Sequence, residues 1–74
     1  MELKVNLSAR NTLSGKVVEL KMGQTTSHVK LDTGGGHIVT ASITNKAVDE
    51  LKLKVGDQAW AVIKASDVMI TKSA

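Results

Sequence analysis

Apolar and polar residues alternate along most of this chain, and this two-residue period restricts its fold more than any other feature. Alternation over short segments bounded by turn residues is typical of half-buried β-strands. The pattern predicts five strands, at residues 13–22, 26–31, 37–43, 58–64 and 68–71. Gly15 predicts a bend or bulge in the first of them. The same alternation at Leu3, Val5 and Leu7 is compatible with a short leading strand.

The period changes to helical spacing after the third strand, where Ala47, Val48 and Leu51 lie on one face. Thr44 or Asn45 is suited to cap this helix. Three strands, one short helix and two further strands are typical of small Greek-key barrels. The sequence therefore predicts a mainly β fold: an OB-like five-stranded Greek-key barrel with one short helix, forming a single domain over residues 1–74.

The predicted core is too small to make a lone monomer very stable. A domain of this length buries only about 60% of its unfolded surface. The chain has no Cys, so neither a disulfide nor a thiolate metal site can reinforce it. Apolar neighbours occur on three strands, at Val17-Val18, Ile38-Val39 and Val62-Ile63. Because successive side chains point to opposite faces, one of each pair lies outside the barrel, and we expect a subunit interface there.

Charge and aromatic content argue against a nucleic-acid partner. Ten Lys or Arg against seven Asp or Glu give a net charge of +3, and the Lys residues are scattered. Trp60 is the single aromatic residue, whereas OB-type single-strand binders stack bases on aromatic platforms. These features count against an OB-type nucleic-acid-binding module, which is kept as the alternative hypothesis. A purely structural oligomerisation module is a third hypothesis.

The sequence also predicts a cytoplasmic protein without a membrane partner. No apolar run approaches the roughly 20 residues that span a bilayer, and the N-terminal segment lacks the apolar core of a signal peptide.

The residue types needed for catalysis or metal binding do not form a recognisable set. Ser8 and Ser66 have no evident His base, so nucleophilic catalysis is not expected. His28 and His37 could face each other on adjacent strands, but a third ligand is not in view. The glycines at 34–36 lack the Lys-Ser/Thr of a phosphate loop and indicate a hairpin tip. We expect a protein that is not an enzyme and has no cofactor.

Two polar segments could instead hold a small oxyanion. Ser8-Ala9-Arg10-Asn11 precedes the first strand, and Lys64-Ala65-Ser66 ends the fourth. Each offers hydroxyls, main-chain N–H groups and one cation, which are the groups that bind tetrahedral oxyanions. Thr44 at the helix start adds a third element. Taken singly, these are an ordinary turn, a solvated strand end and a plain helix cap; strands at the two ends of a closed barrel would bring the first two together.

Four stretches together resemble the molbindins, small stand-alone molybdate-binding proteins built from a single Mop domain. They are Ser8–Asn11 with Leu13 and Gly15, Ala41–Thr44, Leu51–Asp57, and Ala61–Met69. The resemblance covers about residues 7 to 72. It implies an OB-like barrel that assembles as a homohexamer, a trimer of intertwined dimers. It also implies that molybdate or tungstate binds at subunit interfaces, for intracellular storage, buffering or homeostasis.

Carried over position by position, the resemblance implies eight oxyanion-binding residues: Ser8, Ala9, Arg10, Asn11, Thr44, Lys64, Ala65 and Ser66. The two alanines would act through main-chain N–H groups. Lys64 is our predicted main charge partner, because it shares a strand face with Trp60 and Val62 that can cover its stem. The chain departs from the family at Ala47, where some relatives have Ser, and in a longer leader, Met1 to Asn6.

Overall fold

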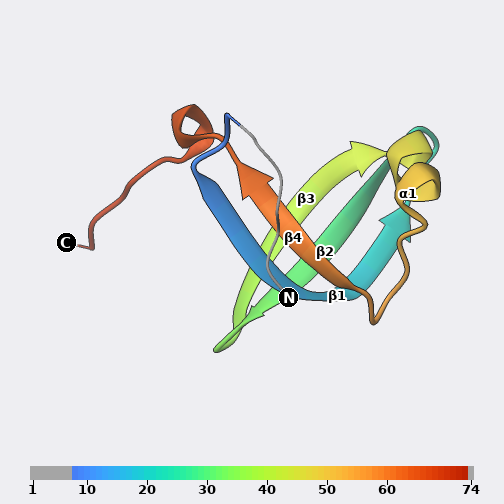
Figure 1. Ribbon diagram of the computed structural model, residues 1–74, viewed down its shortest axis with the longest axis horizontal. Coiled ribbons are helices and arrows are strands. Elements are labelled where there is room, and N and C mark those ends of the chain that lie inside the picture. Colours follow the sequence, from blue (N-terminus) through green and yellow to red (C-terminus); the bar gives the residue numbers. More distant parts are fainter. Residues whose placement is uncertain (1–7, 74) are drawn as a thin grey trace.

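The computed structural model describes residues 8–73, which form one curled antiparallel sheet with a short helix at one end (Figure 1). The strand order in the sheet is β3-β2-β1-β4. The predicted leading strand at Leu3, Val5 and Leu7 lies outside the described residues. The elements in chain order are β1 (Asn11–Met22), β2 (Thr26–Gly34), β3 (His37–Thr44), α1 (Asn45–Leu51), β4 (Gln58–Ile63) and the 3₁₀ turn η1 (Ala65–Asp67).

Strand β1 is long enough to pair with both β4 and β2 along its length. Its first half pairs with β4, from Asn11 opposite Ile63, and its second half pairs with β2 and ends with Met22 opposite Ser27. Figure 1 shows the bend between the two halves, which curls the sheet around its concave face. A register irregularity lies between residues 17 and 19 of β1, slightly beyond the predicted position. Such a bulge bends the strand and increases its twist.

Gly15 contributes to the predicted bend, because it lies where the backbone of β2 comes close to β1. A Cβ atom at this position would collide with the main-chain carbonyl of Asp32 and lie 3.0 Å from the side chain of Leu31. Only glycine allows two backbones to approach in this way. Gly15 therefore permits the tight curl, while the irregularity itself falls at residues 17–19.

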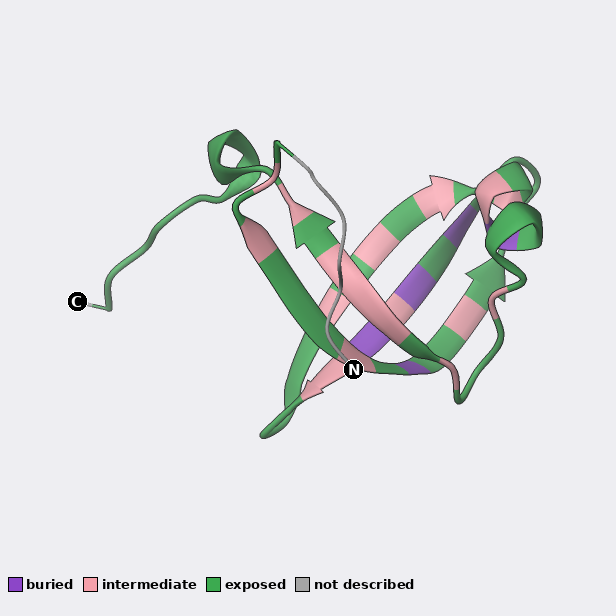
Figure 2. Ribbon diagram, in the orientation of Figure 1, coloured by how far each residue is buried: buried purple, intermediate pink, exposed green. Residues whose placement is uncertain are grey.

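The core is small and lies on the concave face of β1 and β2 (Figure 2). Val17, Val29 and Leu31 form its buried cluster, and Val48 of α1 is also buried. Alternate residues of β2 point inward, as the two-residue period predicts. The partly buried residues packed around the cluster are Leu20, Val39, Ile43, Leu53, Ala59 and Ala61.

The apolar neighbours on three strands behave as expected. Val17 is 1% exposed, whereas Val18 beside it is 42% exposed. Ile38 and Val62 are likewise exposed, at 48% and 45%, although their neighbours on the strand are partly covered. One member of each pair therefore faces outward and leaves apolar surface on the convex side of the sheet.

The predicted fifth strand at residues 68–71 is wrong for the protomer, which has four strands within residues 8–73. η1 turns the chain away from β4, and the following segment extends from the sheet (Figure 1). Met69 and Ile70 in this tail are 93% and 89% exposed. Alternation identifies a segment able to form a strand but does not supply a neighbouring edge for it. The sheet is consequently not closed into a five-stranded barrel, and β3 and β4 are its edge strands.

Helix α1 spans seven residues. Within residues 8–73, no helix has both the length and the apolar character needed to cross a bilayer.

Candidate functional site

The first and last predicted segments lie at the same end of the sheet. Asn11 pairs with Ile63 at the end of the β1–β4 ladder, and its Nδ2 also donates to the main-chain oxygen of Ile63 over 3.3 Å. Because the two strands are antiparallel, Arg10 and Lys64 come directly beyond this pair, at the neighbouring ends of β1 and β4. The structure thus brings residues 8–11 together with residues 64–66, although they are more than fifty residues apart in sequence.

The second segment has main-chain donors at the start of a turn. Lys64 has extended backbone angles, and η1 begins immediately after it at Ala65. Within η1, the N–H of Asp67 donates to the oxygen of Lys64 over 2.9 Å. The first N–H groups of such a turn have no partner inside it, which leaves those of Ala65 and Ser66 for another acceptor. Both residues are exposed, so an anion can reach them.

The two cations near this end are accessible. Arg10 and Lys64 are both exposed, as is Ser8, while Ala9 and Asn11 are partly covered. Within residues 8–73 neither cation has a carboxylate partner within salt-bridge distance. We predicted that Trp60 and Val62 would cover the stem of Lys64. In the single protomer they do not, because Trp60 is only partly covered and Val62 is itself exposed.

Thr44 lies at the other end of the sheet. It is the N-cap of α1, and its Oγ1 accepts a hydrogen bond from the N–H of Ala47 over 3.1 Å. This confirms Thr44, one of the two residues suited to the role, as the cap. α1 and η1 stand at opposite ends of the sheet in Figure 1. A single protomer therefore does not bring Thr44 together with the other predicted residues.

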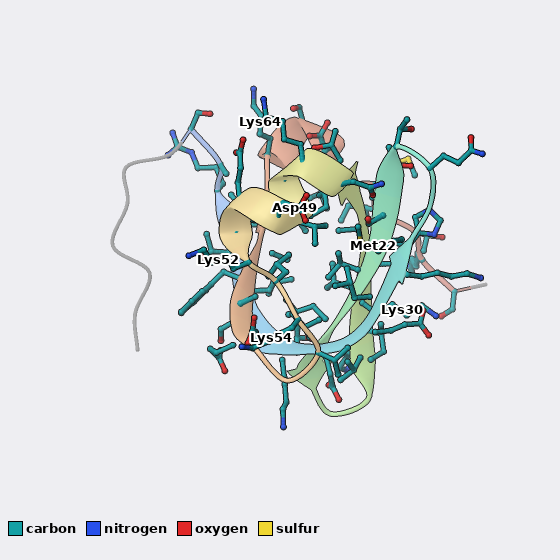
Figure 3. All side chains as sticks on the ribbon, turned by 90° about the vertical axis from the view of Figure 1, so that its right-hand side faces the viewer. Met22, Lys30, Asp49, Lys52, Lys54 and Lys64 are labelled. Atoms are coloured by element: carbon teal, nitrogen blue, oxygen red, sulfur yellow. The ribbon has the colours of Figure 1, made fainter. Side chains whose placement is uncertain are left out.

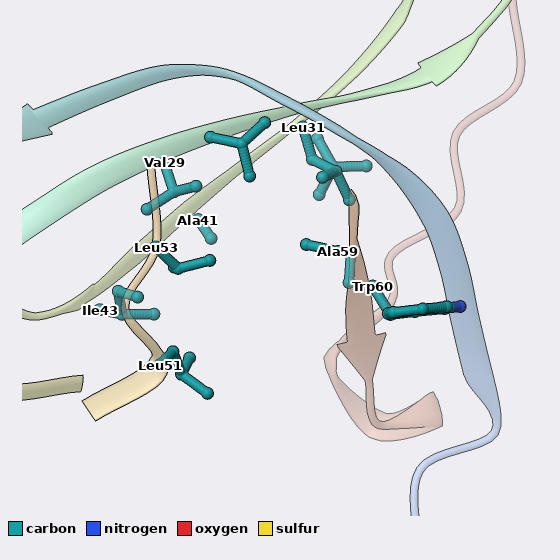
Figure 4. A pocket seen from close by; sticks show the side chains of 11 residues that line it. Val29, Leu31, Ala41, Ile43, Leu51, Leu53, Ala59 and Trp60 are labelled. Carbon is teal, nitrogen blue, oxygen red and sulfur yellow. The ribbon is translucent and has the colours of Figure 1, made fainter. Parts of the chain in front are cut away.

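An apolar hollow in the protomer is separate from the predicted residues. It has a volume of about 170 Å³ and lies between the concave face of the sheet and the chain around the end of α1. Figure 4 shows Leu51 and Leu53 on one side and Ala59 on the other. Its lining contains aliphatic side chains and Trp60. A dianion placed there would lose its hydration without gaining donors, so this cavity is not an oxyanion site. This cavity could not be foreseen from the sequence, because its lining comes from segments that are far apart along the chain.

A second depression, of about 240 Å³, has a mixed polar and apolar lining and lies near the turn between β1 and β2. Its lining includes Lys21, Thr26 and His28, and none of the eight predicted residues.

The suggestion that His28 and His37 face each other is wrong. The β2–β3 register puts His28 opposite Ser42 and His37 opposite Gly34, near opposite ends of the hairpin. Among residues 8–73, no group of three or more His, Asp or Glu side chains is arranged to hold a metal ion. The glycines at 34–36 form the hairpin tip as expected, and each has a positive φ.

Within residues 8–73 the labelled lysines do not form a continuous basic surface. Figure 3 shows Lys30, Lys52, Lys54 and Lys64 at separate places around the molecule. Lys30 is in an ion pair with Glu19 at 3.5 Å. A nucleic-acid backbone binds best to a patch or stripe of clustered cations, which this distribution does not offer.

Comparisons with known proteins agree on one family. Residues 7–70 match the model of the TOBE domain. Molybdenum-pterin-binding protein 1 of Clostridium pasteurianum is 48% identical over 66 residues, which cover 89% of this chain and 97% of that protein. A molybdate-binding protein from Sporomusa ovata has a similar structure, with a TM-score of 0.87 and 31% identity over 92% of this chain and all of that one.

A third match is the cytoplasmic molybdate-binding protein ModG, solved with molybdate bound. It has a TM-score of 0.84 and 46% identity, and the match covers 88% of this chain and 46% of that one.

Proposed function

Since this chain belongs to the TOBE domain family and, within it, to the molbindins, we propose that it binds molybdate, and also tungstate, without catalysing a reaction. The observation that carries the proposal is the pairing of Asn11 with Ile63, which aligns the two polar segments at one end of the sheet. The proposed oxyanion-binding residues are Ser8, Ala9, Arg10, Asn11, Thr44, Lys64, Ala65 and Ser66.

The hydrogen-bond donors at this end suit a tetrahedral dianion, because such an ion accepts hydrogen bonds and has no hydrogen to donate. Ser8 and Ser66 each supply a hydroxyl hydrogen, and Ala65 supplies a main-chain N–H. One N–H of the Asn11 side chain is already given to Ile63, so the second is the one left for the anion. Arg10 and Lys64 supply positive charge, which offsets the cost of removing a dianion from water.

The proposed site is completed by a second subunit. Thr44 is at the opposite end of the sheet from Arg10 and Lys64, so it reaches the anion only if it comes from a neighbouring protomer. We therefore propose a homohexamer, a trimer of intertwined dimers, with anions bound at the subunit interfaces. The exposed apolar side chains of Val18, Ile38 and Val62 support burial of the convex face in such an assembly.

The intertwining is assigned to the C-terminal tail. Residues 68–71 alternate in the manner of a strand, yet they have no partner strand within residues 8–73. β3 and β4 each leave one edge unpaired, and an unpaired edge is a template for a strand from another chain. Exchange of tails between two protomers would supply the missing fifth strand and bury Met69 and Ile70.

The proposed role is storage and buffering of the oxyanion in the cytoplasm. ModG, the relative solved with molybdate, is described as cytoplasmic. A protein that holds an oxyanion through hydrogen bonds, without a covalent step, is suited to release it unchanged.

Native mass spectrometry with and without molybdate tests this function, because it reports the number of chains and of bound anions together. We expect a hexamer that gains a whole number of molybdate ions per assembly, and calorimetry should give micromolar or tighter binding. Tungstate should compete with molybdate, whereas the smaller sulfate should compete poorly because fixed donors fall short of it. Equal displacement by equimolar sulfate would indicate a general anion patch, and the absence of any binding would refute the proposal.

A further inference from the structure

A buried polar cluster joins the start of α1 to the turn between β1 and β2. Ser27 of β2 is completely buried, and its hydroxyl donates to Oδ1 of Asn45, the first residue of α1. Nδ2 of Asn45 donates to the main-chain oxygen of Gly23 over 3.0 Å, and its main-chain N–H donates to the oxygen of Thr25 over 2.9 Å. Asn45 thus bonds to β2 through its side-chain oxygen, and to the turn between β1 and β2 through its side-chain amide and its main-chain N–H.

Asn45 is a poor choice for a helix if propensity alone matters, because alanine stabilises a helix better than asparagine does. A seven-residue helix is also too short to be stable without tertiary contacts. Val48 supplies the buried apolar contact of α1, and Asn45 supplies the polar one. The two contacts together fix the direction in which the helix leaves β3.

The residue immediately before Asn45 is Thr44, whose hydroxyl position depends on that direction. Oγ1 of Thr44 accepts from the N–H of Ala47, one turn into α1. A threonine hydroxyl has two lone pairs and one hydrogen, so this bond leaves the hydrogen available to donate. Thr44 is also paired with Thr26 at the end of the β2–β3 ladder. The pairing with β2 therefore fixes the backbone of Thr44, and the bond from Ala47 fixes its hydroxyl.

We propose that Asn45, with Ser27 beneath it, is a positioning residue for the oxyanion site: it holds α1 so that the Thr44 hydroxyl donates to the bound anion. The inference rests on the proposed function, since it takes Thr44 as a contact of the anion. The side-chain oxygen and one amide hydrogen of Asn45 are already engaged with Ser27 and Gly23, so we assign Asn45 a role through Thr44 and not as a direct contact of the anion.

A double-mutant cycle tests this inference with molybdate affinity measured by calorimetry. The variants are Thr44→Val, Asn45→Ala and the two combined, each checked for assembly by light scattering. We expect each single change to weaken binding by roughly tenfold, the scale of one lost hydrogen bond to a charged group. Because Asn45 acts through Thr44, the combined variant should be no weaker than Thr44→Val within about twofold, which corresponds to about 0.4 kcal/mol.

Three companion variants separate positioning from general destabilisation. Thr44→Ser keeps a hydroxyl and should retain binding. Ser27→Ala removes the buried bond to Asn45 and should weaken binding in the wild-type background but not with Thr44→Val. Asp57→Ala removes a comparable loop bond, from the N–H of Lys54 at 3.0 Å, in the turn before β4. It should lower the melting temperature without changing affinity.

The outcomes distinguish this inference from the function on which it rests. If Thr44→Val weakens binding but Asn45→Ala and Ser27→Ala do not, the positioning role is refuted and the site assignment stands. Losses that add in the combined variant also refute it, since Asn45 would then act independently of Thr44. If Thr44→Val leaves affinity unchanged, Thr44 is not an anion contact, and both the assignment of Thr44 and the positioning role fail.

Discussion

Asn11 and Ile63 pair at the end of the β1–β4 ladder, and the side chain of Asn11 adds a second link to the main chain of Ile63. This relationship joins the N-terminal polar segment to the one that follows β4. The backbone ladder sets the register, and the side-chain bond restrains the last pair where ladders tend to fray.

Replacing Asn11 with alanine should loosen this end of the sheet. Loss of one partly buried hydrogen bond is expected to lower the free energy of unfolding by about 0.5–1.5 kcal/mol. Urea unfolding monitored through Trp60 fluorescence measures this, and Thr12→Ala on the exposed neighbouring position is the matched control. A loss no larger than that of the control would show that the bond adds nothing to the backbone ladder.

A methyl group at position 15 should destabilise the protomer. The Cβ of alanine would meet the carbonyl of Asp32, which belongs to backbone and cannot rotate away. We expect Gly15→Ala to lower the free energy of unfolding by about 1–3 kcal/mol, the usual cost of overpacking. Ser14→Ala, on the adjacent exposed residue, should change it by less than about 0.5 kcal/mol. Equal stability of the two variants would mean that β1 and β2 can separate at Gly15 without cost.

The tail provides a prediction about assembly. Met69→Asp with Ile70→Asp puts charge on side chains that are almost fully exposed in the protomer, so the fold of the protomer should be retained. Burial of those charges in a partner would be costly, so the assembly should dissociate. Light scattering should report a mass well below six times the 7.8 kDa of one chain, while circular dichroism remains unchanged. Ser73→Asp is the control for added charge, and an intact hexamer in the double variant would exclude tail exchange.

The sequence predicted the strands that carry a strong two-residue period, because burial of one face imposes that period. Val29 and Leu31 illustrate this, since both are buried and Lys30 between them is not. Thr44 was predictable as a cap because a hydroxyl in front of a helical period has a local partner, the N–H of Ala47.

The features that the sequence did not predict depend on contacts between distant segments. Residues 68–71 alternate as a strand does, but whether they pair depends on the path of the chain, and η1 turns them away from the sheet. The bonds of Asn45 to Ser27 and Gly23 join three segments that no local pattern connects. The placement of Thr44 beside α1 and of Lys64 beside η1, at opposite ends of the sheet, likewise follows from the path of the strands and not from spacing along the chain.

The last prediction concerns the charge that holds the anion. Molybdate carries two negative charges, and Arg10 and Lys64 are the two cations within the proposed segments. Lys64 immediately precedes η1, so its ammonium and the N–H groups of Ala65 and Ser66 can approach one anion from the same side. We expect Lys64→Ala to weaken molybdate binding by about 1.5–3 kcal/mol, the range of a charge-assisted hydrogen bond. This is about 10- to 150-fold in the calorimetric dissociation constant.

The hexamer should survive this change, because Lys64 is exposed and has no ion-pair partner within residues 8–73. Lys54→Ala is a suitable control, since it removes the same charge from an exposed residue in the turn before β4. If the overall charge merely attracts the anion, both variants weaken binding equally and the effect disappears at high salt. A specific bond requires the loss to be confined to Lys64 and to persist in salt. Unchanged affinity in an intact Lys64→Ala hexamer would rule out Lys64 as the charge partner and leave Arg10, or the main-chain donors alone, as the alternative.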